Sequence, residues 1–141
     1  MEKVLAIIFA TLAGISTSIE AFFNGELGKS TTALVATFIS LLIGTLFFFI
    51  NICVTGNLNE LLNVRSINPK LFLGGILGGL VIYFTVKAIP NLGVSKTLTL
   101  IVVSQILIGF FIDLYIYKEF MHLYNYIGVV LLFLGTFFIL N

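Results

Sequence analysis

Glu20 lies in a long apolar stretch, where an acidic side chain needs an explanation. A charged side chain near the centre of a bilayer costs about 3 kcal/mol on insertion scales and usually faces a cavity or a partner. Ser16 and Thr17 come one helical turn before Glu20, and Asn24 comes one turn after it. A helix would therefore align all four on one polar face. If this face lines a cavity, Glu20 can exchange protons or bind a cation; if it does not, Glu20 reaches the headgroups and only marks the helix end.

Gln105 is the second candidate, near the middle of a later apolar run that also contains Ser104 and Asp113. An amide at this depth can hydrogen-bond to a ligand, or it can join two helices in a contact typically worth about 0.6 kcal/mol. Both interpretations of Gln105 stay open. Asp113 lies close to Tyr115 and Tyr117, so we expect it at the membrane interface, where tyrosines are enriched.

Glycines at helical spacing predict close packing rather than chemistry. Two overlapping GxxxG patterns let another backbone approach a helix, within one chain or between two chains. Ser40 and Gly44 form a similar pair of small residues. The predicted packing glycines are Gly74, Gly75, Gly78 and Gly79 in one run, with Gly128 and Gly135, seven residues apart, in another.

The elements that must position these residues follow from composition. Hydrophobic residues make up 60 % of the chain, charged residues 9 %, and the mean hydropathy is +1.20. A soluble domain of this size could not hide that much apolar surface. We therefore predict an all-α polytopic membrane protein, with residues 1–141 forming a single domain. Five segments approach the roughly 20 residues that cross a bilayer: 4–23, 32–54, 70–88, 94–117 and 123–140.

The segment between the second and third predicted spans, residues 55–69, is rich in asparagine. It is expected to form a polar loop, with an interfacial turn around residues 58–62.

Several function classes find no support in the sequence. His122 is the single histidine and has no metal-ligand partner at suitable spacing, and Cys53 is the single cysteine. No Ser-His-Asp arrangement, CxxC or phosphate-binding glycine loop is present, so we expect neither an enzyme nor a cofactor. A net charge of +1 without a basic patch argues against a nucleic-acid partner.

Five spans would place the two termini on opposite sides of the membrane. Lysine and arginine in short loops normally set orientation, but here they divide four to three: Lys3, Arg65, Lys70 and Lys118 against Lys29, Lys87 and Lys96. One interpretation is a single orientation fixed by this small excess. The other, which we favour, is dual topology with head-to-tail pairing, because a small odd-numbered bundle gains an inverted repeat in this way.

Several short segments resemble the drug/metabolite transporter superfamily, and within it the small YdcZ-type family of inner-membrane exporters. The resemblance covers essentially the whole chain. It rests on the glycine run 74–79, the proline-glycine turn 88–93, Ser104-Gln105, the turn 117–120, the glycine pair of 128–135 and the segment 20–29.

The chain departs from the family pattern at two positions. The family more commonly has glutamine at the position of Glu20 and glycine at that of Ser104. If glutamine serves at this position in relatives, the first departure argues against an obligatory proton carrier at Glu20. The related small multidrug resistance proteins use a first-helix glutamate for proton exchange, but they have four spans.

The resemblance implies a mechanism and a partner. Larger superfamily members look like two five-helix halves in inverted orientation, so a half-length chain could rebuild a ten-helix transporter as an antiparallel homodimer. We predict a secondary transporter, in a bacterial inner membrane, that exports a small organic metabolite or drug-like compound by alternating access between the protomers. The expected substrate or proton ligands are Glu20, Gln105, Asn24, Ser16 and Thr17. The alternative is a non-transporting membrane subunit, or half of a heterodimer with a paralogous partner.

Overall fold

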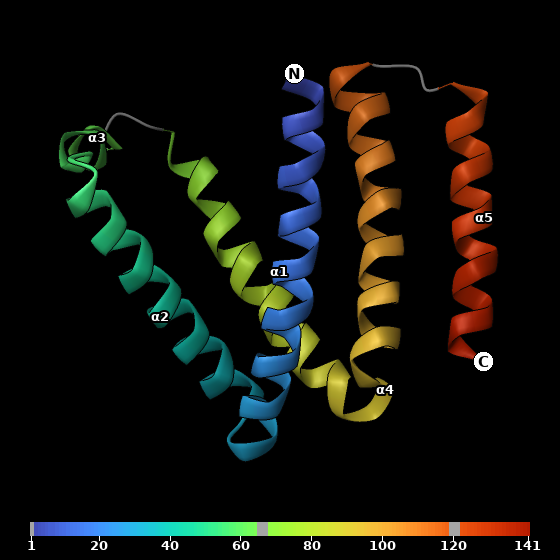
Figure 1. Ribbon diagram of the computed structural model, residues 1–141, viewed down its shortest axis with the longest axis horizontal. Helices are drawn as coiled ribbons and strands as arrows, with labels where there is room; N and C mark the ends of the chain where they lie inside the picture. Colours follow the sequence, from blue (N-terminus) through green and yellow to red (C-terminus); the bar gives the residue numbers. More distant parts are fainter. Residues whose placement is uncertain (1, 65–67, 119–121) are drawn as a thin grey trace. The chain divides into compact units, whose positions relative to one another are not determined.

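The computed structural model describes residues 2–64, 68–118 and 122–141, and all regular structure within these ranges is helical (Figure 1). Arg65 of the charge balance, and residues 119–120 of the family-like turn, lie outside the described residues. The elements are α1 (Glu2–Ser30), α2 (Ala33–Val54), α3 (Leu58–Asn63), a short 3-10 helix (Pro69–Phe72), α4 (Leu73–Ile112), a π-helical segment (Asp113–Tyr117) and α5 (Leu123–Leu140).

Four helical stretches of the described chain are long and apolar enough to cross a membrane: Glu2–Ser30, Ala33–Val54, Pro69–Tyr117 and Leu123–Leu140. The predicted all-helical, polytopic architecture is therefore confirmed. Within the segment expected to be a polar loop with an interfacial turn around 58–62, the structure has a short helix, α3. The predicted third and fourth spans, 70–88 and 94–117, lie together in the stretch Pro69–Tyr117.

Gly93 interrupts α4 with φ 76° and ψ 168°, a conformation essentially restricted to glycine. Pro90, three residues earlier, lacks the N–H that would continue the helical hydrogen bonds. An unbroken helix of 40 residues would be about 60 Å long, twice the thickness of the hydrocarbon layer. The sequence thus divides α4 into two helical segments, each of a length suited to one crossing.

The chain forms two compact units, Met1–Pro90 and Asn91–Asn141. In the first unit, α1 and α2 converge at the turn that joins them and diverge towards their other ends (Figure 1). Thr32 starts α2, because its hydroxyl accepts a hydrogen bond from the Val35 backbone N–H at 3.2 Å and so caps the helix.

The core of the first unit is made of small and β-branched residues near this convergence. Buried positions come from α1, α2 and the part of α4 before Pro90: Ala21, Asn24, Gly25, Ala36, Thr37, Thr85, Val86 and Ile89. A Cβ placed on Gly25 would lie 2.9 Å from Ile89 Cγ2, and one on Gly28 would overlap Val86 Cγ1. Close packing of α1 against α4 therefore requires these two glycines.

Of the glycines predicted to mediate packing, Gly79 is the one with a close neighbour in the described chain: its ideal Cβ position lies 3.2 Å from Leu41 Cδ1 of α2. Apart from the chain neighbours and the backbone of the same helix, no described atom lies within 4 Å of the equivalent point at the other five: Gly74, Gly75, Gly78, Gly128 and Gly135.

In the second unit, α5 runs antiparallel to the part of α4 that follows Gly93 (Figure 1). At one end of this pair, Lys96 Nζ donates a hydrogen bond to the carbonyl of Leu140 at 2.8 Å. A cation at the C-terminus of a helix complements its dipole. At the other end, the rings of Phe110 and Tyr126 stack with centroids 6.1 Å apart.

Most large apolar side chains face outward in both units. Phe9 is 62 % exposed, Phe48 67 % and Phe138 77 %. Patches of this extent would be a liability in water but match the hydrocarbon interior of a bilayer.

Candidate functional site

Asn24 is the polar centre of the first unit. It is 7 % exposed and lies on the inner face of α1, beside Gly25. Its Nδ2 donates to Glu20 Oε1, one turn earlier on α1, and to Ser40 Oγ on α2, both at 3.2 Å. The shared face predicted for Glu20 and Asn24 is thus confirmed. Asn24 links the carboxylate to the second helix.

Glu20 extends from this buried contact into an open space. It lines a cleft of about 810 Å³ whose wall is formed mainly by α2, with Leu61 of α3 and Ile82 of α4 completing it. This volume lies within the range of about 300–1,000 Å³ typical of small-molecule sites. Glu20 is the single ionisable residue among those lining the cleft.

Aromatic and aliphatic side chains make up most of the remaining wall. Phe47 and Phe48 meet edge to face, with ring centroids 5.3 Å apart and an angle of 84°, and Phe49 lies beside them in the sequence. Ser40 and Thr45 supply the hydroxyls of the wall, and the Thr45 hydroxyl donates to the carbonyl of Leu41. The cleft therefore combines one carboxylate with phenyl rings and hydrocarbon, a chemistry suited to an organic cation.

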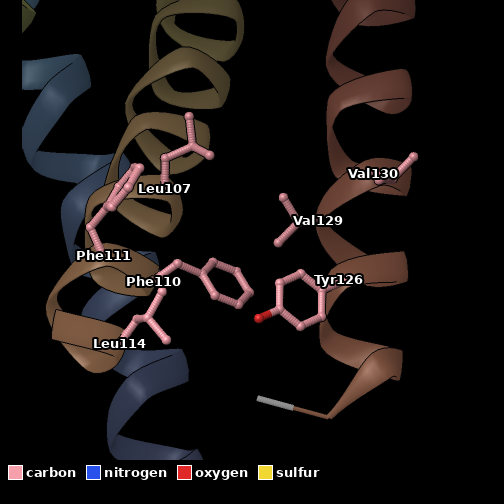
Figure 2. A pocket seen from close by; sticks show the side chains of 7 residues that line it. All are labelled: Leu107, Phe110, Phe111, Leu114, Tyr126, Val129 and Val130. Atoms are coloured by element: carbon pink, nitrogen blue, oxygen red, sulfur yellow. The ribbon is translucent and has the colours of Figure 1, made fainter. Parts of the chain in front are cut away.

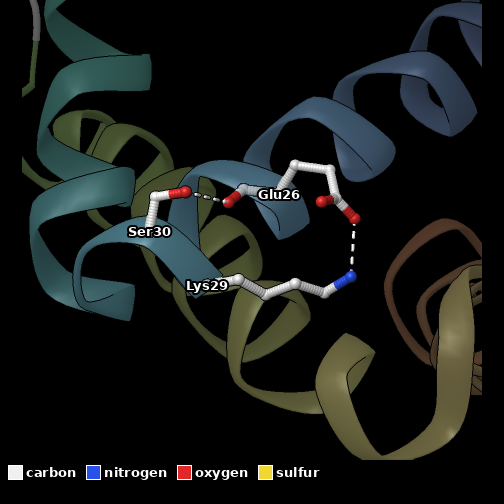
Figure 3. Close-up of polar contacts among 3 residues, drawn as sticks. All are labelled: Glu26, Lys29 and Ser30. Carbon is white, nitrogen blue, oxygen red and sulfur yellow. Dashed lines mark hydrogen bonds and ion pairs between the residues drawn. The ribbon is translucent and has the colours of Figure 1, made fainter.

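Glu26, the other acidic residue near the end of α1, has a different environment. Its Oε1 pairs with Lys29 Nζ at 2.6 Å, and both side chains are about half exposed. Figure 3 shows this pair, with the Ser30 hydroxyl donating to the Glu26 carbonyl. No such ion pair with Glu20 is found among the described residues. Glu26 thus carries a compensated charge at the helix end, whereas Glu20 is held by a neutral amide.

The other predicted site residues are not brought to this cleft. Ser16 and Thr17 are exposed on α1 and do not line it, and Thr17 donates its hydroxyl to the Ala13 carbonyl at 2.9 Å. Gln105 is exposed on α4 in the second unit. A joint site that includes these three residues remains a prediction.

Ser40 is the site residue that sequence reasoning missed, because it was assigned to packing alone. A signal was present: Ser40 follows Ala36 and precedes Gly44 at four-residue intervals, which marks the face of α2 that meets α1. A hydroxyl on such a face has a partner helix within hydrogen-bond reach.

No group of three potential metal ligands occurs in the part of the chain that the structure describes. His122 is exposed at the start of α5, and Cys53 is exposed on α2.

A family model described as "Putative inner membrane exporter, YdcZ" (DMT_YdcZ) matches residues 5–138. The chain belongs to this family. The resemblance found in the sequence is thereby confirmed. The family is one of inner-membrane transporters and not of enzymes, and a membrane protein of this kind contacts the lipid bilayer. No curated protein and no solved structure matches the chain.

Proposed function

We propose that this chain is a secondary transporter that exports a small organic compound, and that the cleft at Glu20 is part of its substrate site. The observation that carries the proposal is the position of Glu20, a carboxylate held by a buried amide at the edge of a cleft of about 810 Å³. An ionisable group in a membrane-spanning segment is by default a functional candidate.

The lining of the cleft favours a compound that is cationic and aromatic. The Glu20 carboxylate attracts a positive centre, and the rings of Phe47 and Phe48 stabilise a cation over their faces by about 0.5–2 kcal/mol. Asn24 and Ser40 add hydrogen bonds that orient the carboxylate. An anionic compound would face repulsion without a compensating cation in the lining.

Coupling to protons follows if the Glu20 carboxylate binds either a proton or the substrate, but not both. Proton binding on one side of the membrane would then release the substrate there. Ser16 and Thr17 extend the same helix face by one turn, and we propose that they contact the substrate as it moves along α1. Gln105 is proposed as a hydrogen-bonding group contributed by the second unit.

Five crossings give the simplest arrangement of these helices. The break at Gly93 divides α4 into two segments of about 30 Å each, the thickness of the hydrocarbon layer. With α1, α2 and α5, the total becomes five, and the termini lie on opposite sides. The residues would form one membrane domain, 1–141.

An antiparallel homodimer would complete the transporter. The nearly equal lysine and arginine numbers on the two sides support insertion in both orientations. Gly74, Gly75 and Gly78 offer an open face for a second helix, as do Gly128 and Gly135. Two copies would present two Glu20 carboxylates to alternate sides of the membrane. The alternative is a subunit that needs an oppositely oriented paralogue or does not itself transport.

The test is uptake of an aromatic quaternary ammonium compound and of its neutral isostere into proteoliposomes with an imposed pH gradient. We expect gradient-driven uptake of the cation by wild type and by Glu26→Gln, and a loss of more than about tenfold in Glu20→Gln. Equal uptake by the two variants would overturn the role of Glu20. No uptake of either compound by wild type would favour the non-transporting subunit.

A further inference from the structure

A second hollow lies entirely within the second unit, between α4 and α5. Its volume is about 300 Å³. Figure 2 shows its walls facing each other, with the Phe110 ring directed towards Tyr126 and Val129 on the opposite helix. The lining residues are Leu107, Phe110, Phe111, Leu114, Tyr126, Val129 and Val130, and we call this hollow the α4–α5 groove.

The lining of the α4–α5 groove is almost entirely apolar, so it favours a hydrocarbon ligand over a polar one. The Tyr126 hydroxyl is the one polar side-chain group among its lining residues. A site for a drug-sized compound normally combines apolar walls with several convergent polar groups. Here the walls are leucine, valine and phenyl side chains, so a bound molecule gains dispersion contacts and almost no hydrogen bonds.

The groove is continuous with the exposed apolar surface of the second unit. Phe111 and Val130 line it and are also 56 % and 58 % exposed, so the apolar wall continues outward at these two side chains. Since the chain belongs to an inner-membrane exporter family, this apolar wall is suited to contact with acyl chains rather than with water.

One end of the groove lies next to residues typical of the membrane interface. Leu114 belongs to the π-helical segment, which also contains Tyr115 and Tyr117 and is followed by Lys118. On the other helix, Tyr124 is 83 % exposed two residues before Tyr126. Tyrosines concentrate at headgroup depth. From there the groove runs from Leu114 back to Leu107, two turns or about 10 Å towards the bilayer centre.

We propose that the α4–α5 groove is a binding site for one acyl chain of a membrane phospholipid, with the headgroup beside the exposed tyrosines. A groove of about 10 Å holds a large part of a chain that spans one leaflet of about 15 Å. Tyr126 is placed to donate its hydroxyl to the ester carbonyl of the lipid. The bound chain fills the space that the Phe110–Tyr126 stack leaves between the two helices. This site is independent of the transport activity proposed for Glu20.

The chain contains no tryptophan, so a single introduced one reports its surroundings without background. The experiment places tryptophan in the groove by Phe110→Trp and, as a control on the lipid-facing surface, by Phe138→Trp. Each full-length variant in detergent is titrated with a phosphatidylcholine brominated in its acyl chains, which quenches tryptophan on contact. Phe111→Trp provides a second groove probe if the first variant does not fold.

We expect the groove probe to be quenched in a saturable manner near one lipid per chain, at a lipid ratio about tenfold below that needed at position 138. Val129→Phe, which fills the groove, should abolish this saturable phase. Leu131→Phe, at an exposed position outside the groove, should leave it intact.

Two results would overturn the proposal. Quenching that is gradual and equal at both positions would mean that lipid does not occupy the groove specifically. Quenching that is weaker in the groove than at position 138 at every lipid ratio would mean that protein covers the groove, for which a second copy of the chain is the natural candidate.

Discussion

Asn24 gives the Glu20 carboxylate a fixed position. A buried amide without partners is costly, so Asn24 must use its donors, and the structure directs them to Glu20 and Ser40. These bonds tie the polar group of α1 to α2 at the point where the two helices converge. The carboxylate is thereby held at the edge of the cleft instead of turning along the helix towards the headgroups.

Replacing Asn24 by leucine should therefore affect both stability and substrate binding. The variant loses one interhelical hydrogen bond, to Ser40, worth about 0.6 kcal/mol, and one hydrogen bond within α1, to Glu20, so we expect the free energy of unfolding in mixed micelles to fall by about 1 kcal/mol. Asn51→Leu is the matched control, because the Asn51 amide donates to the carbonyl of Phe47 within its own exposed helix face. Equal losses in the two variants would contradict the linking role of Asn24.

The pairing of Glu20 and Asn24 was predictable from the sequence, whereas their partner on α2 was not. Four-residue spacing places two side chains on one helix face whatever the rest of the fold does. The contact with Ser40 depends on how α1 crosses α2, which no local pattern of either helix determines. Ser16 also shows what spacing cannot predict. Its spacing places it on the same face of α1 as Glu20, but it does not line the cleft.

At the scale of the element, the packing of α1 against α4 depends on two glycines on the α1 face that meets α4. Gly25 and Gly28 allow Ile89 and Val86 to pack against the α1 backbone. The sequence predicted helix contacts at the more conspicuous glycine run of 74–79, where Gly79 alone has a close neighbour in the described chain. Glycine spacing identifies faces able to pack closely, but it does not say which face meets which partner.

Gly28→Ala should destabilise the chain by about 1–3 kcal/mol, because the added methyl group overlaps Val86, a stiff and buried residue. Gly14→Ala in the same helix is the control: no described atom lies within 4 Å of its Cβ, so it should be neutral or slightly stabilising. Val86→Ala should restore part of the stability of Gly28→Ala. The same unfolding titration measures all three, and an absence of rescue would refute the proposed α1–α4 contact.

Gly93 sets the length of the two segments of α4. Gly93→Ala forces a side chain into a backbone conformation that costs about 1–3 kcal/mol, so we expect a clear loss of stability. Gly109→Ala, within the regular part of the same element and with no described atom near its Cβ, should have little effect. Indistinguishable unfolding free energies for the two variants would show that the break at Gly93 is not a required feature.

At the scale of the whole molecule, the charge balance bears on the assembly. Composition was sufficient to predict a polytopic helical membrane protein, because an apolar surface of this extent has no other stable setting. The predicted orientation of the chain in the membrane depends on a difference of one lysine or arginine between the two sides, four against three. So small a difference gives neither orientation a strong preference. Because the charge difference is so small, pairing between opposite orientations stays a proposal that a topology measurement must test.

The orientation can be measured with a cysteine introduced by Asn141→Cys in a Cys53→Ser background. Labelling with a membrane-impermeant thiol reagent is compared in intact and permeabilised cells. Dual insertion predicts that roughly half of the chains are labelled from outside, because neither orientation has a strong charge advantage. Labelling of nearly all or nearly none would mean a single orientation and would direct the search to an oppositely oriented partner.

The central claim is that the Glu20 carboxylate exchanges a proton for substrate, and proton release on substrate binding tests it most directly. An aromatic quaternary ammonium compound is added to purified protein in weakly buffered detergent solution, and the pH change is recorded across a range of starting pH. Wild type and Glu26→Gln should release protons in proportion to the cation bound, and Glu20→Gln should release none. Undiminished proton release from Glu20→Gln would contradict the account.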